Sequence, residues 1–263
     1  MKKIFLTGAS SGIGLAIAKM LAARGHEVWG TSRDVNRVFV LPRLHAVKLD
    51  LADRQSVSEG FDTALQAAGR FDVLINNAGS GHFGPAELLS QRELANQFQV
   101  LFFAQIELIR LALKSMRDQE SGLIINVTSL ASRLPVPFMA AYNAAKAALA
   151  SYTMSIQLES QNARFRIIDL QPGDIRTNFN DSASKHVTED ARVAKAWQAV
   201  DRNMRAAPEP ELVAAHVLKL ISQSNPSPRI TVGDFFQSKI APLVFRFLSQ
   251  RVRLWGLKKY YGI

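Results

Sequence analysis

The stretch Thr7-Gly8-Ala9-Ser10-Ser11-Gly12-Ile13-Gly14 decides the fold, because it joins a short apolar run, Ile4–Leu6, to a helical pattern, Ile13–Arg24. Glycines let the backbone turn tightly and approach a pyrophosphate, and the next helix offers unpaired N–H groups and the positive end of its dipole. The spacing G-x-x-x-G-x-G differs from the usual G-x-G-x-x-G, and an ordinary strand-to-helix turn can also be Gly-rich. The flanking strand and helix favour a dinucleotide-binding turn.

Short apolar runs alternate with longer helical patterns along the rest of the chain. The runs that predict strands are Ile4–Leu6, Glu27–Thr31, Ala46–Leu49, Asp72–Asn76, Leu123–Val127, Arg164–Leu170 and Arg229–Val232. The helical patterns are Ile13–Arg24, Asp53–Ala68, Gln91–Arg117, Tyr142–Ser160 and Glu209–Ser222. Strands that are apolar on both faces and separated by helices indicate a parallel sheet covered on both sides. No Gly/Ser-rich linker or internal repeat divides the chain, so we expect one α/β domain.

The composition excludes several classes of protein. With 263 residues, 48% of them hydrophobic, the chain can form a core and is too apolar to be disordered. The absence of cysteine excludes disulfides, thiolate nucleophiles and Cys-ligated metals. The net charge of +10, with a pI near 10.1, fits nucleic acid, an anionic membrane or an anionic ligand. The apolar start is too short for a signal peptide and no apolar run approaches the ~20 residues that span a bilayer, so we expect a cytoplasmic protein, with association with a membrane surface left open.

The end of the second predicted strand bears on the cofactor. An NAD site places a carboxylate about 20 residues past the glycines, to bind the ribose 2′-hydroxyl. Here Ser32 lies 18 residues beyond Gly14 and is uncharged, and Arg33 can pair with a 2′-phosphate. This pattern favours NADP, although Asp34 is adjacent and Arg33 could equally be a solvated loop charge.

A serine, a tyrosine and a lysine form a candidate catalytic group. Tyr142 and Lys146 are four residues apart in a predicted helix and so share one face, and Ser129 follows the strand Leu123–Val127. An ammonium beside a phenol lowers the tyrosine pKa from about 10 toward neutrality, which suits proton transfer to a carbonyl or alcohol oxygen. Ser129 could hydrogen-bond the same oxygen. A Tyr-x-x-x-Lys pair alone is usually a surface pair, but downstream of a nucleotide turn it is far more specific.

These segments together resemble the classical short-chain dehydrogenases/reductases of the NADP-preferring type, over residues 2–233. The matching pieces, in the family's order, are Thr7-Gly8-x-x-x-Gly12-Ile13-Gly14, Asp50-Leu51, Asn76-Asn77-Ala78-Gly79, Ser129, Tyr142-x-x-x-Lys146 and Pro172-Gly173. The resemblance implies a single Rossmann-like, doubly wound domain over residues 1–234, with a seven-stranded parallel sheet flanked by helices. It implies hydride transfer between the nicotinamide C4 of NADP(H) and a carbonyl or alcohol carbon. It also implies a homodimer or homotetramer.

The resemblance assigns a role to each matching residue. Tyr142 would be the general acid/base, Lys146 would hold the nicotinamide ribose and lower the pKa of Tyr142, and Ser129 would orient the substrate. Asp50 would bind adenine, and a Ser-Arg pair such as Ser32-Arg33 goes with NADPH. The implied cofactor-binding residues are Gly8, Ser10, Ser11, Gly12, Ile13, Gly14, Ser32, Arg33, Asp50, Leu51, Asn77, Ala78, Gly79, Tyr142, Lys146, Pro172, Gly173, Ile175 and Thr177.

One position departs from the family pattern. The family carries an asparagine in the long helix before the LIINV-like strand, and this chain has Leu101 there, with Phe98 and Val100 anchoring the alignment. The asparagine is thought to help hold a water that relays protons to the lysine, which leucine cannot do. Asn96 lies nearby, so the register is an open point.

The resemblance places the substrate between Ser80–Pro85, Ala131–Phe138 and a segment from Asp174 to about Ala207. The second segment includes Leu134-Pro135-Val136-Pro137-Phe138, which predicts either an apolar wall or ordinary loop packing. The third is long enough to act as a lid. His186 and the other histidines show no metal-ligand spacing, so we predict no metal site.

The last 29 residues, 235–263, form a basic tail with no acidic residue. Its cations contribute +6, which leaves 26 Lys and Arg against 22 Asp and Glu, or +4, for residues 1–234. The apolar residues Ile240, Leu243, Val244, Phe247 and Leu248, continued by Leu254 and Trp255, follow helical spacing. A basic amphipathic helix of this kind is typical of an interfacial membrane anchor, and the alternative is a helix docked on its own domain or on a second subunit.

Three functional hypotheses follow. The first is an NADP(H)-dependent oxidoreductase that interconverts a carbonyl and a secondary alcohol on an apolar or lipid-like substrate. The second, raised by Leu101, is a catalytically impaired NADP-binding sensor or scaffold. The third, a nucleic-acid binder, is suggested only by the pI, and the main domain lacks a basic stripe with interleaved aromatic residues, so we expect no nucleic-acid partner.

Overall fold

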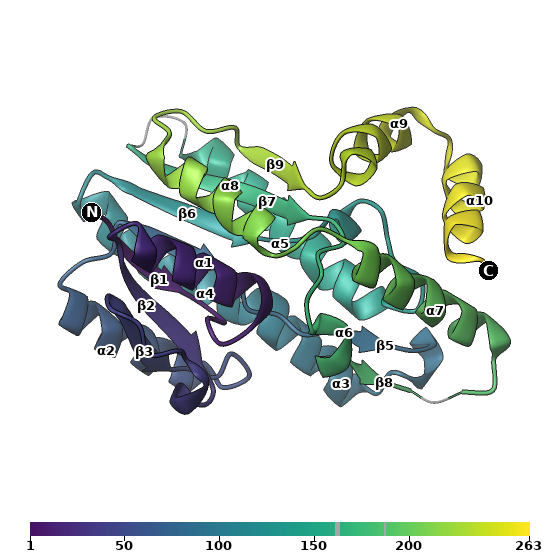
Figure 1. The fold of residues 1–263 in the computed structure, drawn as a ribbon, viewed down its shortest axis with the longest axis horizontal. Coiled ribbons are helices and arrows are strands. Elements are labelled where there is room, and N and C mark those ends of the chain that lie inside the picture. Colours follow the sequence, from purple (N-terminus) through teal and green to yellow (C-terminus); the bar gives the residue numbers. More distant parts are fainter. Residues whose placement is uncertain (161–163, 187) are drawn as a thin grey trace.

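The computed structural model describes residues 1–160, 164–186 and 188–263 (Figure 1). Its centre is a seven-stranded sheet with the order β3-β2-β1-β4-β6-β7-β9, in which all neighbours are parallel. The strands are β1 (Lys3–Leu6), β2 (Glu27–Ser32), β3 (Leu44–Lys48), β4 (Val73–Asn76), β6 (Gly122–Val127), β7 (Phe165–Pro172) and β9 (Arg229–Val232). The predicted α/β fold, a single doubly wound domain with a seven-stranded parallel sheet, is confirmed.

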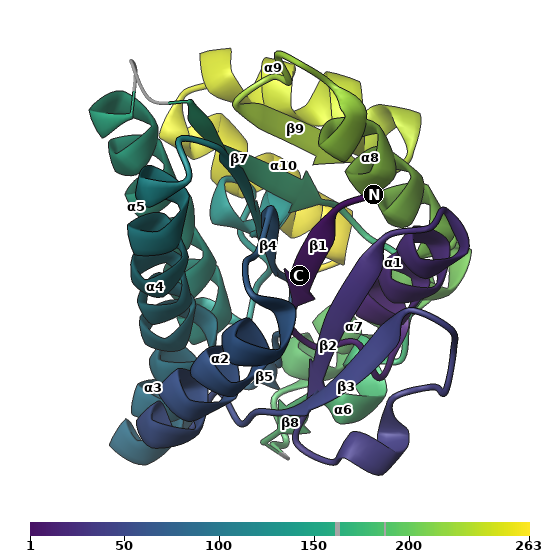
Figure 2. The same ribbon diagram turned by 90° about the vertical axis from the view of Figure 1, so that its left-hand side faces the viewer.

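Helices cover both faces of the sheet (Figure 2). One face packs against α1 (Gly12–Ala23) and α8 (Glu211–Ser222), and the other against α2 (Arg54–Ala68), α4 (Ala104–Asp118) and α5 (Ala140–Glu159). Side chains of a strand alternate between the faces, so Ile4 and Leu6 of β1 join the first core and Phe5 joins the second. Burial on both faces explains why the central strands β1, β4 and β6 are largely apolar runs.

The order of the strands positions the site. From β1 the chain moves outward in one direction through β2 and β3, and then returns to the other side of β1 with β4. Ligands of open parallel sheets bind beyond the carboxyl ends of the strands, at this change of direction. The glycine-rich turn follows β1 and the segment Asn77–Gly79 follows β4, so both lie at that edge.

The predicted long helix Gln91–Arg117 is interrupted. It consists of α3 (Gln91–Phe98), a π-helical segment η3 (Gln99–Phe103) and α4. The π-helical segment contains Leu101, whose side chain is fully buried. Such π-helical turns occur often at functional sites.

The segment between β4 and α3 pairs with the segment after β7. The short strands β5 (His82–Phe83) and β8 (Ser184–Lys185) form a two-stranded parallel ribbon, which the sequence did not predict because two-residue strands have no periodicity. The remaining short elements are η1 (Val35–Arg37), η2 (Ala86–Leu88), η4 (Leu130–Ser132) and α6 (Phe179–Ser182), and the longer helix α7 (Ala191–Ala206) follows β8.

The tail contains two helices after a π-helical turn. The turn η5 (Phe236–Ile240) leads into α9 (Ala241–Phe247), and α10 (Gln250–Tyr261) follows. The prediction of one continuous amphipathic helix is therefore wrong. The chain is extended at Leu248, and Arg253 donates hydrogen bonds to the carbonyl oxygens of Arg246 (3.1 Å) and Leu248 (2.9 Å), which satisfies the end of α9.

The second tail helix is docked on the domain. α10 lies against α7, and Tyr261 is buried in a small apolar cluster with Val193, Val200 and Phe83. Among the described residues, none of the helices combines the length and the apolar character that crossing a bilayer requires.

Candidate active site

The glycine-rich turn is shaped for close approach of a ligand. Gly8 and Gly12 have positive φ angles of +74° and +51°, which other residues adopt only with strain. A Cβ on Gly14 would overlap the carbonyl oxygen of Gly8. The Thr7 hydroxyl accepts hydrogen bonds from the backbone N–H groups of Asn77 (2.9 Å) and Ala78 (3.0 Å), so the turn is fixed to the end of β4.

A cavity of about 1050 Å³ begins at this turn. Every predicted site residue lines it, from the turn to the predicted catalytic group: Gly8, Ser10, Ser11, Gly12, Ile13, Gly14, Ser32, Arg33, Asp50, Leu51, Asn77, Ala78, Gly79, Ser129, Tyr142, Lys146, Pro172, Gly173, Ile175 and Thr177. Residues far apart in the sequence thus meet around one space large enough for a dinucleotide and a second molecule.

The end of β2 carries two arginines toward the cavity. Ser32 is buried, and the next residue, Arg33, is exposed and lines the cavity together with Arg37. The Asp34 carboxylate accepts a hydrogen bond from the backbone N–H of Asn36 (3.0 Å) and caps η1. Among the described residues, neither arginine forms an ion pair. The sequence reasoning did not single out Arg37, because it stands in a loop without periodicity.

Ser129, Tyr142 and Lys146 lie together at the ends of β6 and α5. The Ser129 hydroxyl accepts a hydrogen bond from the N–H of Ala131 (3.0 Å) and also hydrogen-bonds Tyr142. Lys146 is buried one helical turn after Tyr142, and its Nζ donates to the carbonyl oxygen of Val127 (2.8 Å). The fold therefore groups the three predicted catalytic side chains.

The protonation of this group differs from the expectation. Burial raises the pKa of Tyr142 above its ordinary value, and the hydrogen bond from Ser129 only partly opposes this. Burial lowers the pKa of Lys146 to about 8, against the opposing charge of Asp169. The expected lowering of the Tyr142 pKa by Lys146 is not found, because Nζ lies 6.0 Å from the centre of the tyrosine ring and is bound to a backbone carbonyl.

Leu101 lies beside the predicted catalytic lysine. A Cβ built on Gly79 would lie 3.1 Å from Leu101 Cδ2 and 3.7 Å from Lys146 Nζ, so the three residues adjoin one another. The neighbouring Gln105 is buried, and its Nε2 donates to the carbonyl oxygens of Ala78 (3.1 Å) and Val100 (3.2 Å). Leu101 thus presents an apolar side chain beside Lys146, at the position where the resemblance leads us to expect an amide.

The tail forms part of the wall of the cavity, and a contact with the substrate is one of the alternatives that its sequence leaves open. Its lining side chains are mainly apolar: Ile240, Val244, Phe245, Leu248, Val252 and Leu257. Of the proline-rich segment, Leu134 and Val136 also line the cavity, whereas the prolines and Phe138 do not. The tail and this segment therefore give the cavity a largely apolar stretch of wall.

A glutamine fixes the tail to the domain. Gln237 is buried, and its Oε1 accepts a hydrogen bond from the N–H of Asp174 (2.8 Å). Its Nε2 donates to the Asp174 carboxylate (2.5 Å) and to the Tyr260 hydroxyl (3.3 Å). Burial raises the pKa of Asp174, and the hydrogen bond from Gln237 opposes that shift. Asp174 and Gln237 are 63 residues apart, so no local sequence pattern predicts their contact.

Comparison with known proteins identifies the family. Residues 2–188 match the family model described as short chain dehydrogenase. The chain belongs to this family. Its members are oxidoreductases, and this chain is accordingly an oxidoreductase of the CH–OH/C=O class. A 3-ketodihydrosphingosine reductase of Bacteroides thetaiotaomicron is 30% identical over 266 residues, an alignment that covers 99% of this chain and 98% of that protein.

Solved short-chain dehydrogenase structures show the class of cofactor. A metagenomic short-chain oxidoreductase in complex with NADP is 29% identical, with a TM-score of 0.72 over 88% of this chain and 96% of that chain. A 3-ketoacyl-(acyl-carrier-protein) reductase from Brucella melitensis in complex with NADH is 25% identical, with a TM-score of 0.74 over 87% of this chain and 94% of that chain. Similar proteins thus bind a nicotinamide dinucleotide.

Proposed function

We propose that this short-chain dehydrogenase is an NADP(H)-dependent reductase of a long-chain, lipid-like ketone, with Tyr142 as the general acid/base. The observation that carries the proposal is the single cavity that runs from the glycine-rich turn past Tyr142 to the apolar wall of the tail. The similarity over nearly the whole chain to a 3-ketodihydrosphingosine reductase supports the same class of substrate.

The residues at the end of β2 favour NADP over NAD. Arg33 and Arg37 supply two cations beside Ser32, and the Asp34 carboxylate is engaged as the cap of η1. A guanidinium hydrogen-bonds a phosphate with two parallel N–H groups, so these arginines suit a 2′-phosphate. The glycine-rich turn, which has no room for a Cβ at Gly14, suits the pyrophosphate.

The reduction needs one hydride and one proton. Held at the glycine-rich turn, NADPH would supply the hydride. The phenol of Tyr142 donates its proton to the carbonyl oxygen, and the raised pKa of Tyr142 keeps it protonated at neutral pH. Ser129 hydrogen-bonds the same oxygen, and Lys146, one helical turn beyond Tyr142 and lining the same cavity, would hold the nicotinamide ribose.

Kinetics with NADPH and 3-ketodihydrosphingosine test the proposal. We expect steady NADPH oxidation, and a Tyr142→Phe variant that binds NADPH normally but loses about 10²- to 10⁴-fold in kcat. A short methyl ketone serves as the comparison substrate and should react far less efficiently. Equal kcat in the wild type and Tyr142→Phe would contradict the role of Tyr142.

Leu101 supports a second candidate, a cofactor-binding sensor with impaired catalysis. Its apolar side chain adjoins Lys146, where the family pattern has an asparagine. NADPH binding without turnover on a panel of long-chain and short-chain ketones would favour this candidate over the reductase.

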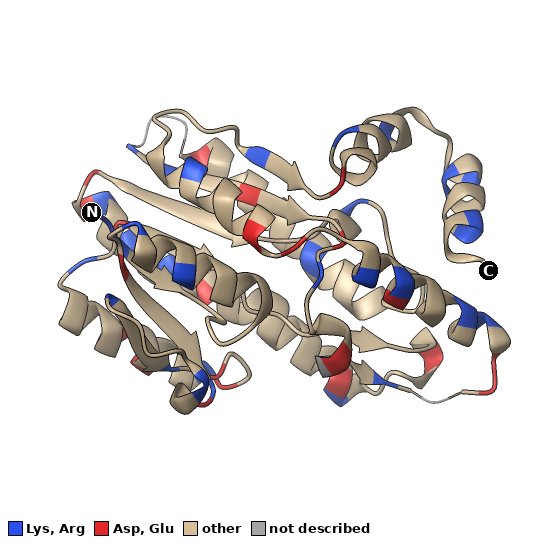
Figure 3. Cartoon of the chain, in the orientation of Figure 1, with Lys and Arg blue, Asp and Glu red and all other residues tan. Residues whose placement is uncertain are grey.

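We also propose that the tail contacts an anionic membrane. Its outward side chains include Leu243, Phe247 and Trp255, which are 60%, 78% and 62% exposed, and its Lys and Arg residues are drawn without any Asp or Glu (Figure 3). Exposed apolar groups beside cations are typical of interfacial anchors. Co-sedimentation with phosphatidylglycerol vesicles should weaken in a Leu243→Ser/Phe247→Ser variant, and equal binding of the two proteins would contradict the contact.

A dimer through α4 and α5 is the assembly that we propose. The two helices lie side by side along one edge of the molecule (Figure 2). Exposed apolar residues here include Met154 and Leu158 of α5 and Phe103, which directly precedes α4. Light scattering coupled to size-exclusion chromatography should give at least twice the mass of the chain. A monomer at all concentrations would contradict this assembly.

A further inference from the structure

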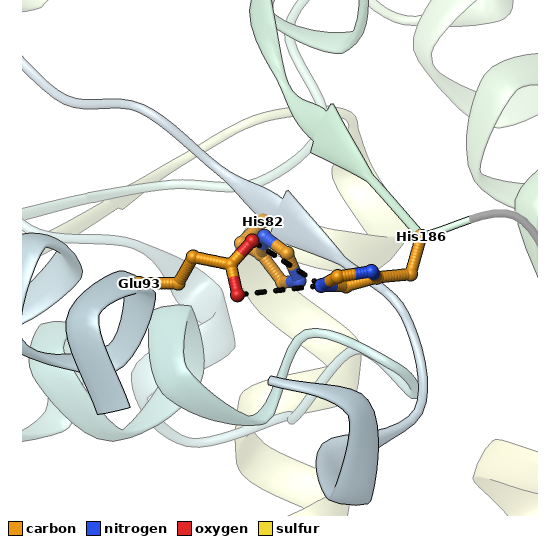
Figure 4. Close-up of side chains that lie close together, drawn as sticks. All are labelled: His82, Glu93 and His186. Carbon is orange, nitrogen blue, oxygen red and sulfur yellow. Dashed lines mark hydrogen bonds and ion pairs between the residues drawn. The ribbon is translucent and has the colours of Figure 1, made fainter. Parts of the chain in front are cut away.

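Three side chains able to bind a metal meet outside the cavity described above. His82 belongs to β5, Glu93 to the first turn of α3, and His186 directly follows β8 (Figure 4). One potential ligand atom from each residue lies within 4.8 Å of the others. The ribbon brings the histidines together, since the N–H of His186 donates to the carbonyl oxygen of Phe83 (3.0 Å) and the imidazole centres are 4.8 Å apart.

We propose that His82, Glu93 and His186 form a binding site for one Zn²⁺ ion. Two imidazoles and one carboxylate are a ligand set that zinc accepts in tetrahedral geometry, with water as the fourth ligand. The ligand atoms lie within 4.8 Å of one another and need to approach by up to about 1.5 Å, because Zn–N and Zn–O distances near 2 Å place ligand atoms roughly 3.3 Å apart.

His82 provides an independent sign of a missing ligand. Its side chain is 5% exposed, and Nδ1 is hydrogen-bonded to the Ser184 hydroxyl (2.8 Å). Nε2 is buried and has no hydrogen-bond partner among the described residues. Figure 4 shows a ring nitrogen of His82 turned toward His186 and Glu93. A buried polar atom without a partner is unfavourable, and binding of a metal ion satisfies it.

The groups around the ligands orient them for a metal. A ligating histidine usually donates its other ring N–H to a neighbouring oxygen, and Ser184 takes this part for His82. Ser90 holds Oε2 of Glu93 through its backbone N–H (2.9 Å) and its hydroxyl (2.6 Å). Oε1 of Glu93 is then directed toward His186 Nε2, at 3.2 Å.

A metal ion at this position would join two segments that flank the cavity. His82 follows the Asn77–Gly79 turn, and His186 belongs to the segment between β7 and α7, whose Phe179 ring packs on Tyr142 at 5.6 Å. Zinc bound by both would hold the ribbon closed over this side of the site. Its role would be structural, because the three ligands do not line the cavity.

Titration calorimetry with ZnCl₂ tests the site on the untagged, full-length protein after removal of metals by a chelator. We expect one Zn²⁺ bound per chain, and an affinity lowered at least 10-fold in His82→Gln, Glu93→Gln and His186→Gln. Ser184→Ala, which keeps all three ligands, should weaken binding by about 10- to 100-fold. NADPH affinity, measured on each variant, reports that it is folded.

His26→Gln is the matched control, because His26 lies outside the cluster and accepts a hydrogen bond from the backbone N–H of Lys2 (3.1 Å). It should bind Zn²⁺ like the wild type, and Co²⁺ should show the visible absorption of a tetrahedral complex. Failure of the wild type to bind Zn²⁺, or an equal loss in His26→Gln and His186→Gln, would overturn the proposal. If His82→Gln does not fold, the site is tested by the His186→Gln variant, whose side chain is partly exposed in the wild type, and by the Ser184→Ala variant.

Discussion

β1 and α9 are both rich in apolar residues, but they differ in exposure. Ile4, Phe5 and Leu6 of β1 are 0% exposed, whereas Leu243 and Phe247 of α9 are 60% and 78% exposed. β1 has helices on both faces, while α9 has the cavity on one side and nothing from the described residues over its outer side chains. An apolar sequence pattern therefore predicts burial only where other elements supply a partner.

The domain to which β1 belongs, residues 1–234, and the tail to which α9 belongs also differ in charge. Residues 1–234 carry +4, and the 29 residues of the tail carry +6, with no acidic side chain (Figure 3). The charge that made nucleic acid one of the partner classes thus belongs mostly to the tail, beside its outward apolar side chains. In residues 1–234 the predicted catalytic side chains are held in fixed positions by the surrounding structure. In the tail, one face lines the cavity and the other is exposed.

The largest expected contrast comes from the same substitution in each region. Gly14→Ala places a Cβ against the carbonyl oxygen of Gly8 and 2.5 Å from Asn77 Nδ2, so we expect NADPH binding to be lost. Gly256→Ala lies within α10 with nothing within 4 Å, and it should stabilise the protein by roughly 0.5–1 kcal/mol. Fluorescence titration with NADPH and thermal unfolding measure both. Normal NADPH affinity in Gly14→Ala would contradict the account of the turn.

A pair of phenylalanines separates the two faces of the tail. Phe245 lines the cavity and Phe247 does not. We expect Phe245→Ala to lower kcat/KM for a long-chain ketone by about 10- to 100-fold, because apolar contact with the substrate is lost. Phe247→Ala should keep kcat/KM and weaken binding to anionic vesicles. If both variants have the same effect in both assays, the two faces do not have separate roles.

Lys146 connects catalysis to pH-dependent stability. Its pKa is about 8 in the folded chain and 10.5 when unperturbed, so between these values the unfolded state binds more protons and stability rises with pH. Lys146→Met removes the buried charge, and we expect it to be more stable than the wild type below pH 8, by a few kcal/mol at most. This difference should shrink toward pH 10.5. Denaturant unfolding across this range measures it, and a pH-independent difference would refute the assignment.

The smallest effect is expected at Leu101. Leu101→Asn restores an amide beside Lys146, and we expect a several-fold rise in kcat with unchanged NADPH affinity. Leu101→Ala controls for the change in side-chain volume and should not raise kcat. Steady-state kinetics of the three proteins decide, and identical kcat values would show that the position has no part in proton transfer.

Local patterns explain how much of the fold and the site could be predicted. Strand and helix periodicity, the glycine-rich turn and the Tyr142–Lys146 spacing are each contained within a few consecutive residues, so the strands, helices and nucleotide turn were predictable from local pattern. The seven strands of the sheet and the grouping of the other site residues, such as Asp50 and Pro172, were implied by the family resemblance. The π-turn at Leu101, the pairing of β5 with β8 and the contact of Gln237 with Asp174 depend on tertiary packing. His186 and Glu93, 93 residues apart, meet only because that ribbon forms.

The tail shows the limit of pattern reasoning most clearly. Helical spacing from Ile240 to Trp255 predicted one helix, but Arg253 closes the end of α9 and a new helix begins at Gln250. After the break, α10 lies against α7. Residues of both tail helices, α9 and α10, line the cavity. The sequence left open whether the tail binds a membrane, the substrate or another subunit, or docks on its own domain, and the structure shows α10 docked against α7 with tail residues lining the cavity.

The dependence of kcat/KM on the length of the ketone chain tests the central claim most directly. In the wild type each added methylene should raise kcat/KM by about fourfold until the apolar wall is filled, since its burial is worth about 0.8 kcal/mol. A Phe245→Ala/Leu248→Ala variant, with unchanged NADPH affinity, should show a much shallower dependence. No dependence on chain length in the wild type, or the same slope in both proteins, would contradict a tail that binds the substrate chain.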